Sequence, residues 1–181
     1  MKKLFLACAV AVAGLVNAQE ATTAATGLDG AWWGMGTLQY TNNDATDVST
    51  FTIMPVVGNF ISPTVTVGLG AGYIGSKNGE DADWVNSFAL TPLARKYWGV
   101  ANNLYIFGQA AVPMTFSDDV NTFGFQLSPG VDYFLSDQFT IEATIGGAGY
   151  TNYSPEVGDS HGETNIGFDM TKLQFGLKYI F

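Results

Sequence analysis

Two short stretches of the chain carry residue types and spacings that are associated with chemistry. Gly70 and Gly75 frame a G-x-G-x-x-G pattern within "GLGAGYIG", and this spacing binds dinucleotide phosphates in other folds. The only histidine, His161, lies beside Ser160 in "GDSHGE", and an imidazole next to a hydroxyl supplies the groups of a general base and a nucleophile. Whether either stretch functions depends on the elements that hold it.

The glycine pattern lacks the helix that a phosphate site requires. In dinucleotide sites a helix follows the glycines, and its N-terminal amides meet the pyrophosphate. Here the residues after Gly75 read "SKNGED" and show no helical periodicity. We therefore interpret these glycines as strand residues that leave space for larger side chains, and we expect no cofactor.

The histidine and serine are also poorly arranged for catalysis. They are adjacent in a glycine-containing loop, whereas a base and its nucleophile normally come from separate elements. The acidic loops lack the D-x-[DN]-x-[DN]-G pattern of a calcium-binding loop. The sequence thus predicts no catalytic residues and no metal site, and a protein that is not an enzyme.

The N-terminus has the three-part pattern of a secretory signal peptide. Lys2 and Lys3 precede a short apolar run, and "VNA" ends at Ala18, so residues 1–18 are predicted to be cleaved. Residues 19–29 are predicted to form a short periplasmic tail. Removal of 1–18 takes away the only cysteine and leaves five basic against 16 acidic residues. A chain this acidic is not expected to bind nucleic acid, whose phosphates would repel it.

Alternation of apolar with small or polar residues dominates the rest of the chain. From Thr64 to Tyr73 the odd positions are apolar and the even positions are threonine or glycine. A period of two over about ten residues is strand geometry. Similar alternation extends from Phe123 to Tyr133 and from Phe139 to Ile145.

A repeat indicates how many strands there are. Pro55, Pro92 and Pro129 are 37 residues apart, and each is followed five residues later by an aromatic side chain. One repeat suits a hairpin of two strands, and residues 31–181 have room for four. The predicted strands are 31–41, 48–60, 64–75, 85–99, 104–116, 122–135, 139–151 and 164–181.

Some positions predict irregular pairing. Prolines at 55, 92, 113 and 129 lie inside predicted strands, where they lack a ladder donor. Gly146 and Gly147 suggest a bulge, because the alternation changes phase around them. In the last predicted strand the apolar residues change from even positions, such as Ile166, to odd positions from Leu173 on. Either a bulge near Thr171 and Lys172 causes this change, or the upper segment stands above a bilayer.

The ends of the strands give the fold a direction and a resemblance. Connections after Phe60, Gly99 and Leu135 are tight, while the opposite ones are longer and acidic, as in outer-membrane barrels with periplasmic turns. With "TPLARKYW", "SPGVDYFLSDQFTIEATIGGAGY" and the ending "LQFGLKYIF", the chain resembles the small outer-membrane β-barrel family, such as the transmembrane domains of OmpA and OmpX proteins. The expected fold is an all-β, eight-stranded, antiparallel up-and-down transmembrane β-barrel spanning 30–181. The resemblance further implies that Tyr179 and Phe181 form the signal for the barrel assembly machinery.

The inward polar face holds a predicted layer of charge. Placing the polar face of each strand inside gives four uncharged residues, Tyr105, Gln109, Gln126 and Gln174, and four charged ones. The charged residues are Arg95, Asp132, Glu142 and Lys178, each a few residues from a turn or the C-terminus. Charges inside such a barrel must be partnered, so we predict pairs of Arg95 with Glu142 and of Lys178 with Asp132. A structural plug is the favoured interpretation; a gate or proton path is the alternative.

These observations together predict an integral protein of the cell outer membrane with a structural or surface-interaction role and a filled lumen. The alternatives are a narrow solute channel, a lipid-A-modifying barrel enzyme and a soluble lipocalin-like binding barrel. Expected partners are outer-membrane lipids, lipopolysaccharide and the assembly machinery, and the acidic loops or the barrel wall offer surfaces for a protein partner.

Overall fold

The structure is a computed structural model that describes residues 28–43, 47–79, 82–144, 146–167 and 174–181. Within these ranges no helix is long and apolar enough to span a membrane. The predicted signal peptide and residues 19–27 of the predicted tail lie outside the described residues. The strands are β1 Trp32–Asn43, β2 Val48–Ser62, β3 Val65–Asn78, β4 Val85–Ala101, β5 Leu104–Ala111, β6 Met114–Ser117, β7 Val120–Phe134, β8 Phe139–Thr144, β9 Gly147–Pro155, β10 His161–Gly167 and β11 Gln174–Ile180.

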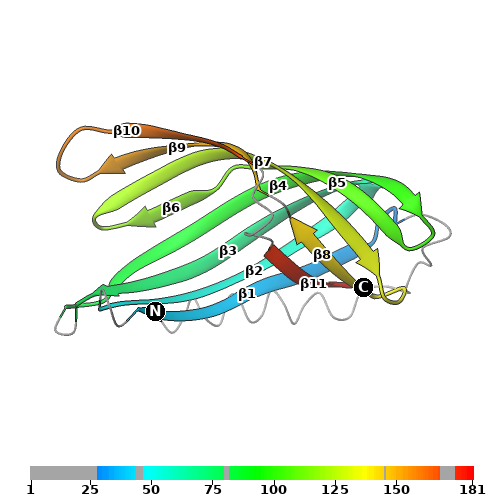
Figure 1. The fold of residues 1–181 in the computed structure, drawn as a ribbon, viewed down its shortest axis with the longest axis horizontal. Helices are drawn as coiled ribbons and strands as arrows, with labels where there is room; N and C mark the ends of the chain where they lie inside the picture. Colours follow the sequence, from blue (N-terminus) through cyan, green and yellow to red (C-terminus); the bar gives the residue numbers. More distant parts are fainter. Residues whose placement is uncertain (1–27, 44–46, 80–81, 145, 168–173) are drawn as a thin grey trace.

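Eight of these strands close into an antiparallel barrel. The ring runs through β1, β2, β3, β4, β5, β7, β8 and β11, and it closes where β11 pairs with β1 (Figure 1). The strands β6, β9 and β10 lie outside this ring and extend the wall. An eight-stranded, all-β antiparallel barrel was the predicted fold, and the structure confirms it.

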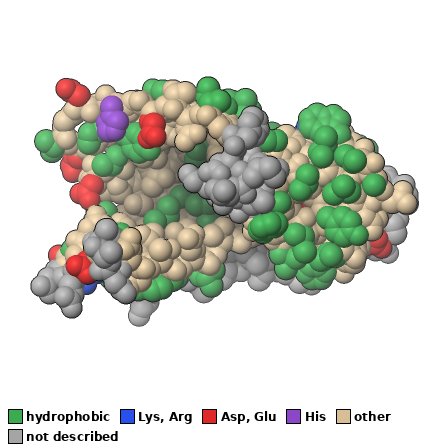
Figure 2. All heavy atoms as spheres, viewed as in Figure 1, with side chains coloured by type: hydrophobic (Ala, Val, Ile, Leu, Met, Phe, Trp, Pro, Cys, Tyr) green, Lys and Arg blue, Asp and Glu red, His purple; other side chains and the backbone are tan. Residues whose placement is uncertain are grey.

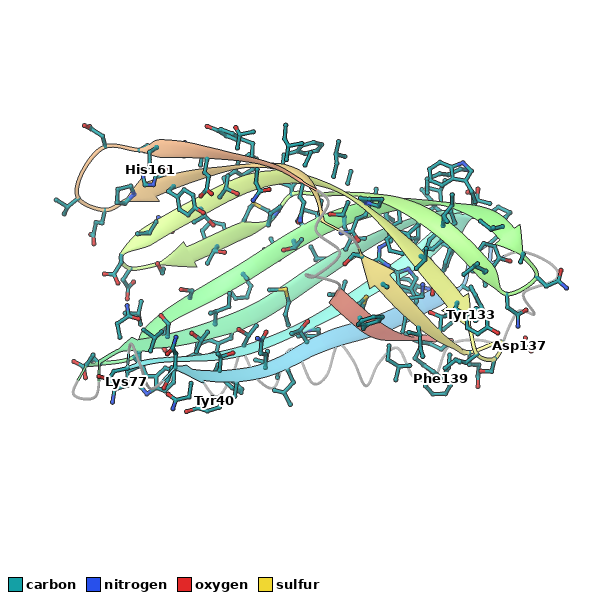
Figure 3. All side chains as sticks on the ribbon, in the orientation of Figure 1. Tyr40, Lys77, Tyr133, Asp137, Phe139 and His161 are labelled. Carbon is teal, nitrogen blue, oxygen red and sulfur yellow. The ribbon has the colours of Figure 1, made fainter. Side chains whose placement is uncertain are left out.

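The two ends of the barrel differ. One end, which we call the turn end, holds the short connections 63–64, 102–103 and 135–138 and the C-terminal residue. The other, the loop end, holds the longer connections 79–84 and 156–160, together with 44–47 and the short 118–119. Figure 3 shows Asp137 with Tyr133 and Phe139 at the turn end, and His161 and Lys77 at the loop end.

Two of the predicted strands, 104–116 and 139–151, are each divided in two. The predicted strand 104–116 breaks at Val112 and Pro113, where Val112 N still donates to Pro92 O over 3.0 Å. The ladder between β2 and β3 likewise skips Met54 and Pro55 without a change of register. Proline has no amide hydrogen, so it weakens the ladder at these positions as predicted.

The predicted bulge at Gly146 and Gly147 is also present. Leu127 pairs with Ala148 and Gly130 with Thr144, so two residues on β7 oppose three on the neighbouring chain segment. The extra residue reverses which face is apolar between β8 and β9. The predicted bulge near Thr171 and Lys172 lies outside the described residues.

Closure of the wall is less complete than expected. The sequence predicted one strand over 164–181 that seals the barrel along its length. Instead β11 pairs with β1 only at Trp33 and Gly34, and β10 pairs only with β9, so no ladder joins β10 to β1 within the described residues. Figure 2 shows the resulting hollow between these two parts of the wall, toward the loop end.

Apolar side chains cover the outside of the barrel, while polar side chains lie inside. Exposed outward residues include Val67, Phe125, Ile141 and Phe175, the last 73% exposed. Figure 2 shows hydrophobic side chains over the turn half of the surface and acidic ones gathered at the loop end. Buried polar residues are Thr66, Arg95, Ser128, Asp132, Thr140, Glu142 and Lys178.

The inward glycines make room for aromatic rings, as predicted. Trp33 is fully buried, and its indole packs over Gly58 and Gly68: a Cβ added at Gly58 would collide with it, and one added at Gly68 would lie 3.1 Å from it. A Cβ at Gly130 would collide with the ring of Phe107. The G-x-G-x-x-G pattern lies within β3, so it forms a packing surface and not the start of a helix.

Candidate functional site

The four predicted luminal charges lie together near the turn end. Arg95 is on β4, Asp132 on β7, Glu142 on β8 and Lys178 on β11. Asp132 faces Glu142 across the β7–β8 ladder, and Lys178 faces Thr140, two residues from Glu142, across β8–β11. Strand register therefore brings residues from four strands to one depth.

Arg95 and Glu142 form a two-point ion pair. The Arg95 Nη1 atom donates to Glu142 Oε2 over 2.6 Å, and Nη2 donates to Oε1 over 3.0 Å. Arg95 Nε also donates to Gln109 Oε1 over 2.6 Å. Parallel contacts of this kind fix the guanidinium plane, so Arg95 is held on three sides.

Lys178 and Asp132 form the second pair. Lys178 Nζ donates to Asp132 Oδ2, and it also contacts the Tyr97 hydroxyl over 3.2 Å and Glu142 Oε2 over 3.7 Å. Both side chains are fully buried. Both predicted pairings are thus confirmed, and the 3.7 Å contact joins them into one network.

The network leaves two polar atoms unmatched. Among the described residues, Asp132 Oδ1 and Thr140 Oγ1 are buried without a hydrogen-bond partner. Buried polar atoms are nearly always paired, so each lowers the stability gained from the layer.

An aromatic cluster seals the lumen around the charges. Phe60, Tyr97 and Phe107 pack ring to ring with centroids 5.5–5.6 Å apart. The Arg95 guanidinium lies 4.8 Å from the Phe107 ring and 5.2 Å from the Trp33 ring, within cation–π range. The charges are therefore enclosed by rings as well as by their partners.

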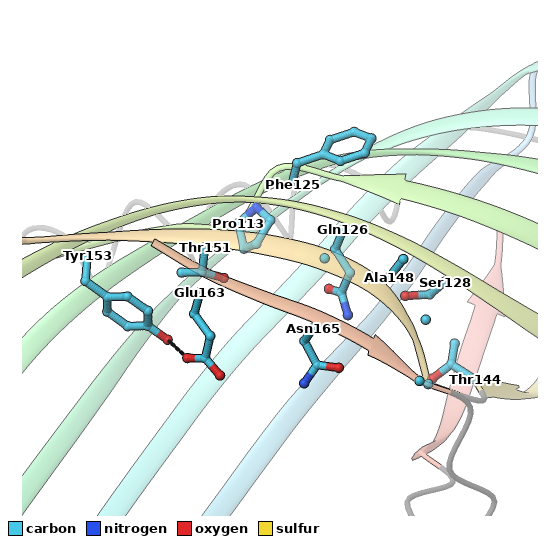
Figure 4. A pocket seen from close by; sticks show the side chains of 14 residues that line it. Pro113, Phe125, Gln126, Ser128, Thr144, Ala148, Thr151, Tyr153, Glu163 and Asn165 are labelled. Atoms are coloured by element: carbon cyan, nitrogen blue, oxygen red, sulfur yellow. Dashed lines mark hydrogen bonds between the residues drawn. The ribbon is translucent and has the colours of Figure 1, made fainter. Parts of the chain in front are cut away.

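A polar hollow begins directly above this layer, toward the loop end. A cavity of about 510 Å³ lies against the inner face of β7, β9 and β10 and is lined by Gln126, Ser128, Thr151 and Asn165, among others (Figure 4). Ser128 pairs with Gln109, which accepts from Arg95. The lumen thus has a closed half and a hollow half that meet at the charged layer.

The other predicted residues have varied outcomes. Gln126 lines the cavity, and Tyr105 packs against Phe134 at 5.2 Å. The side chain of Gln174 lies outside what the structure describes. Tyr179 stacks near Phe181 at 6.0 Å, and Phe181 N donates to Trp32 O over 2.8 Å, so the last residue is paired with the first strand.

The histidine and serine of "GDSHGE" do not form a relay. His161 stacks on Tyr153 with centroids 5.1 Å apart, and Ser160 Oγ donates to Ser154 Oγ over 3.3 Å. Both residues are exposed. Among the described residues no group of three or more histidine, cysteine or acidic side chains is arranged to hold a metal.

Gln109, predicted to face inward, supports Arg95. Two residues of the site were not predicted from the sequence to belong to it, Trp33 and Tyr97, and both lie among the charges. The repeat carried a signal for Tyr97, because its aromatic position falls two residues after Arg95 on the same inward face. No family model matches this chain, and no curated protein resembles it significantly.

Proposed function

We propose that the chain is an integral outer-membrane β-barrel protein whose lumen is plugged at the turn end and whose role is structural or one of surface interaction. The observation that carries this proposal is that apolar side chains lie on the outside of the barrel and charged side chains lie inside, the reverse of a water-soluble protein. A closed barrel with an apolar exterior and a buried charged interior suits a lipid environment, where strands need an outward apolar band and inward polar residues.

The same distribution argues against a soluble binding barrel. A lipocalin-like protein needs an apolar cavity and a polar exterior. Here Arg95, Asp132, Glu142 and Lys178 lie inside, while large apolar residues such as Leu69, Ile106 and Phe123 are 44–56% exposed outside. In water that surface would be an aggregation hazard.

The turn half of the lumen argues against a continuous channel. Trp33, Phe60 and Tyr97 are at most 4% exposed, and the ion-pair network spans the bore beside them. Eight-stranded barrels have interiors that side chains can fill, whereas open porins use about 16 strands. The acidic loop end would face the outside, with lipopolysaccharide as its neighbour and with space for a protein partner.

The tight turns and Phe181 would then lie on the periplasmic side. The pairing of Phe181 with Trp32 closes the barrel at its last residue, which supports a role for Tyr179 and Phe181 in recognition by the barrel assembly machinery. The N-terminal segment 1–18 would direct export.

Extraction and gel mobility test the proposal. The protein should remain in the membrane fraction after alkaline carbonate and urea washes, and unboiled folded protein in detergent should migrate differently from the boiled form. Recovery of the mature chain as a monodisperse protein in detergent-free buffer would contradict it.

A further inference from the structure

The outer wall of the barrel carries an apolar groove beside an isolated cation. The groove has a volume of about 550 Å³ and crosses the outer face of β3, β4, β5, β7, β9 and β10. Five small residues line it together with the larger Val65, Leu127 and Ile166; the small ones are Ala94, Gly108, Ala110, Pro129 and Ala148. Neighbouring outward positions are large, and the ring of Trp98 lies against the backbone of Gly108.

Lys96 lies at the end of this groove that is nearer the turn end of the barrel. It is exposed on the outer wall, and its ammonium donates to Thr64 Oγ1 in the connection between β2 and β3. Within the described residues it makes no ion pair. Arg95 and Lys178, by contrast, form ion pairs with carboxylates inside the lumen. A long side chain that reaches from an apolar wall to the level of a turn places its charge at a membrane interface.

The groove rises from Lys96 toward the middle of the barrel. Lys96 is five residues from the end of β4 at Ala101, whereas Ile166 faces Ala148 on β9, which faces Leu127, seven residues before the end of β7 at Phe134. Four strand spacings of about 4.8 Å separate Lys96 from Ile166 by about 19 Å, and a strand tilt of about 45° turns this into a rise of about 14 Å. Half of a hydrocarbon core of about 30 Å is about 15 Å, so the groove spans about one leaflet.

We propose that this groove binds one glycerophospholipid of the leaflet that faces the turn end, with its phosphate at Lys96 and one acyl chain along the small residues. This inference rests on the proposed membrane location. Charge complementarity selects the phosphate, and the apolar floor selects the chain. A second copy of the protein would be the competing occupant, and it would add the mass of a whole chain instead of one lipid.

Lipid titration tests the site. Folded protein in a maltoside detergent is mixed with dioleoyl phosphatidylglycerol, and bound lipids are counted by native mass spectrometry. We expect one lipid to bind before any others. Lys96→Gln should weaken its binding about fivefold, equivalent to about 1 kcal/mol for one basic residue at a membrane surface. Ala110→Leu, which fills the floor, should weaken it at least tenfold.

Matched variants separate the site from general effects. Ala71→Leu adds the same bulk to an outward alanine of β3 outside the groove, and Lys77→Gln removes a cation at the loop end; both should bind as the wild type does. Dioleoylglycerol, which has the chains but no phosphate, should bind more weakly and should not distinguish Lys96→Gln from wild type.

Several results would overturn the inference. These are equal lipid binding by wild type and both groove variants, lipid adducts that never saturate, or a dimeric mass that Ala110→Leu abolishes. If gel mobility shows that Ala110→Leu does not fold, Lys96→Gln still tests the lipid site, because it changes only an exposed side chain. A wild type that resists extraction but binds no lipid at this site refutes the groove alone, whereas a wild type that does not enter membranes refutes the membrane location as well.

Discussion

Removing the carboxylate of Glu142 should destabilise the barrel strongly. Glu142 is 3% exposed and accepts two hydrogen bonds from Arg95, at 2.6 and 3.0 Å. In Glu142→Ala the guanidinium keeps Gln109 as its remaining close partner, at 2.6 Å. Breaking one side of a buried pair typically costs about 3–5 kcal/mol. Water from the adjoining cavity would solvate the freed guanidinium, so we expect about 3 kcal/mol.

Urea titration of the folded fraction measures this loss. Protein refolded into detergent or vesicles is incubated across a urea series, and the folded and unfolded bands are quantified on an unboiled gel, with folding and unfolding limbs compared to establish equilibrium. The midpoint should fall while the slope stays constant. Glu163→Ala is the matched control, because Glu163 is exposed and its hydrogen bond from Tyr153 is long at 3.5 Å; it should change stability by less than about 0.5 kcal/mol.

A second variant tests whether the cost comes from the uncompensated charge. Replacing both partners, as in Arg95→Met with Glu142→Leu, removes both charges of this ion pair and should recover most of the stability lost in Glu142→Ala. If Glu142→Ala lies within about 1 kcal/mol of both wild type and Glu163→Ala, the ion pair does not hold the lumen together. The reasoning from burial and geometry would then be wrong.

Four other outcomes are expected. In planar bilayers the wild-type protein should show no large, stable conductance, and a steady open channel would refute the plugged lumen. Changing Tyr179 and Phe181 to serine should lower the folded amount in the outer membrane, measured by gel mobility of membrane fractions; unchanged levels would remove the assembly-signal interpretation. Gly58→Ala should cost about 1–3 kcal/mol through overlap with the indole that covers it, while Gly167→Ala, with open space around it, should cost much less by urea titration. Thr140→Val should leave stability unchanged or raise it, because the hydroxyl has no partner among the described residues; a clear loss would reveal one.

The parts of the fold that follow from local periodicity could be predicted from the sequence. The number of barrel strands followed from the 37-residue repeat, and the inward position of Arg95 and Glu142 from the period of two. A strand register cannot slip by one residue without exposing the buried face. The ion pairs followed because four charges at one depth in a narrow bore have few other partners. The bulge at Gly146 could also be predicted, because the alternation of apolar and polar residues changes phase there.

The parts that depend on contacts between distant strands could not be predicted. Nothing local to Trp33 indicates that its ring occupies the space above Gly58 and Gly68, because that packing depends on the register of β1, β2 and β3 together. The limited pairing of β11 with β1 also depends on the whole ring. Likewise, Lys96 reads as an ordinary surface lysine until the small residues of three other strands are brought beside it.

The 37-residue repeat explains why the turn end of the barrel is filled. Each repeat proline faces outward, and the aromatic side chain five residues later is buried inside, so every repeat adds one ring to the floor of the barrel. Between the prolines and the turn end, Phe60, Tyr97 and the ion pairs fill the bore. Toward the loop end the ladders are interrupted at Pro113 and Gly146, and the cavity opens. Because packed cores are stable and interrupted ladders are the regions that open first, stability is concentrated at the turn end. The hollow, acidic loop half is then free to vary in shape, and the surface interaction that we propose would use that half.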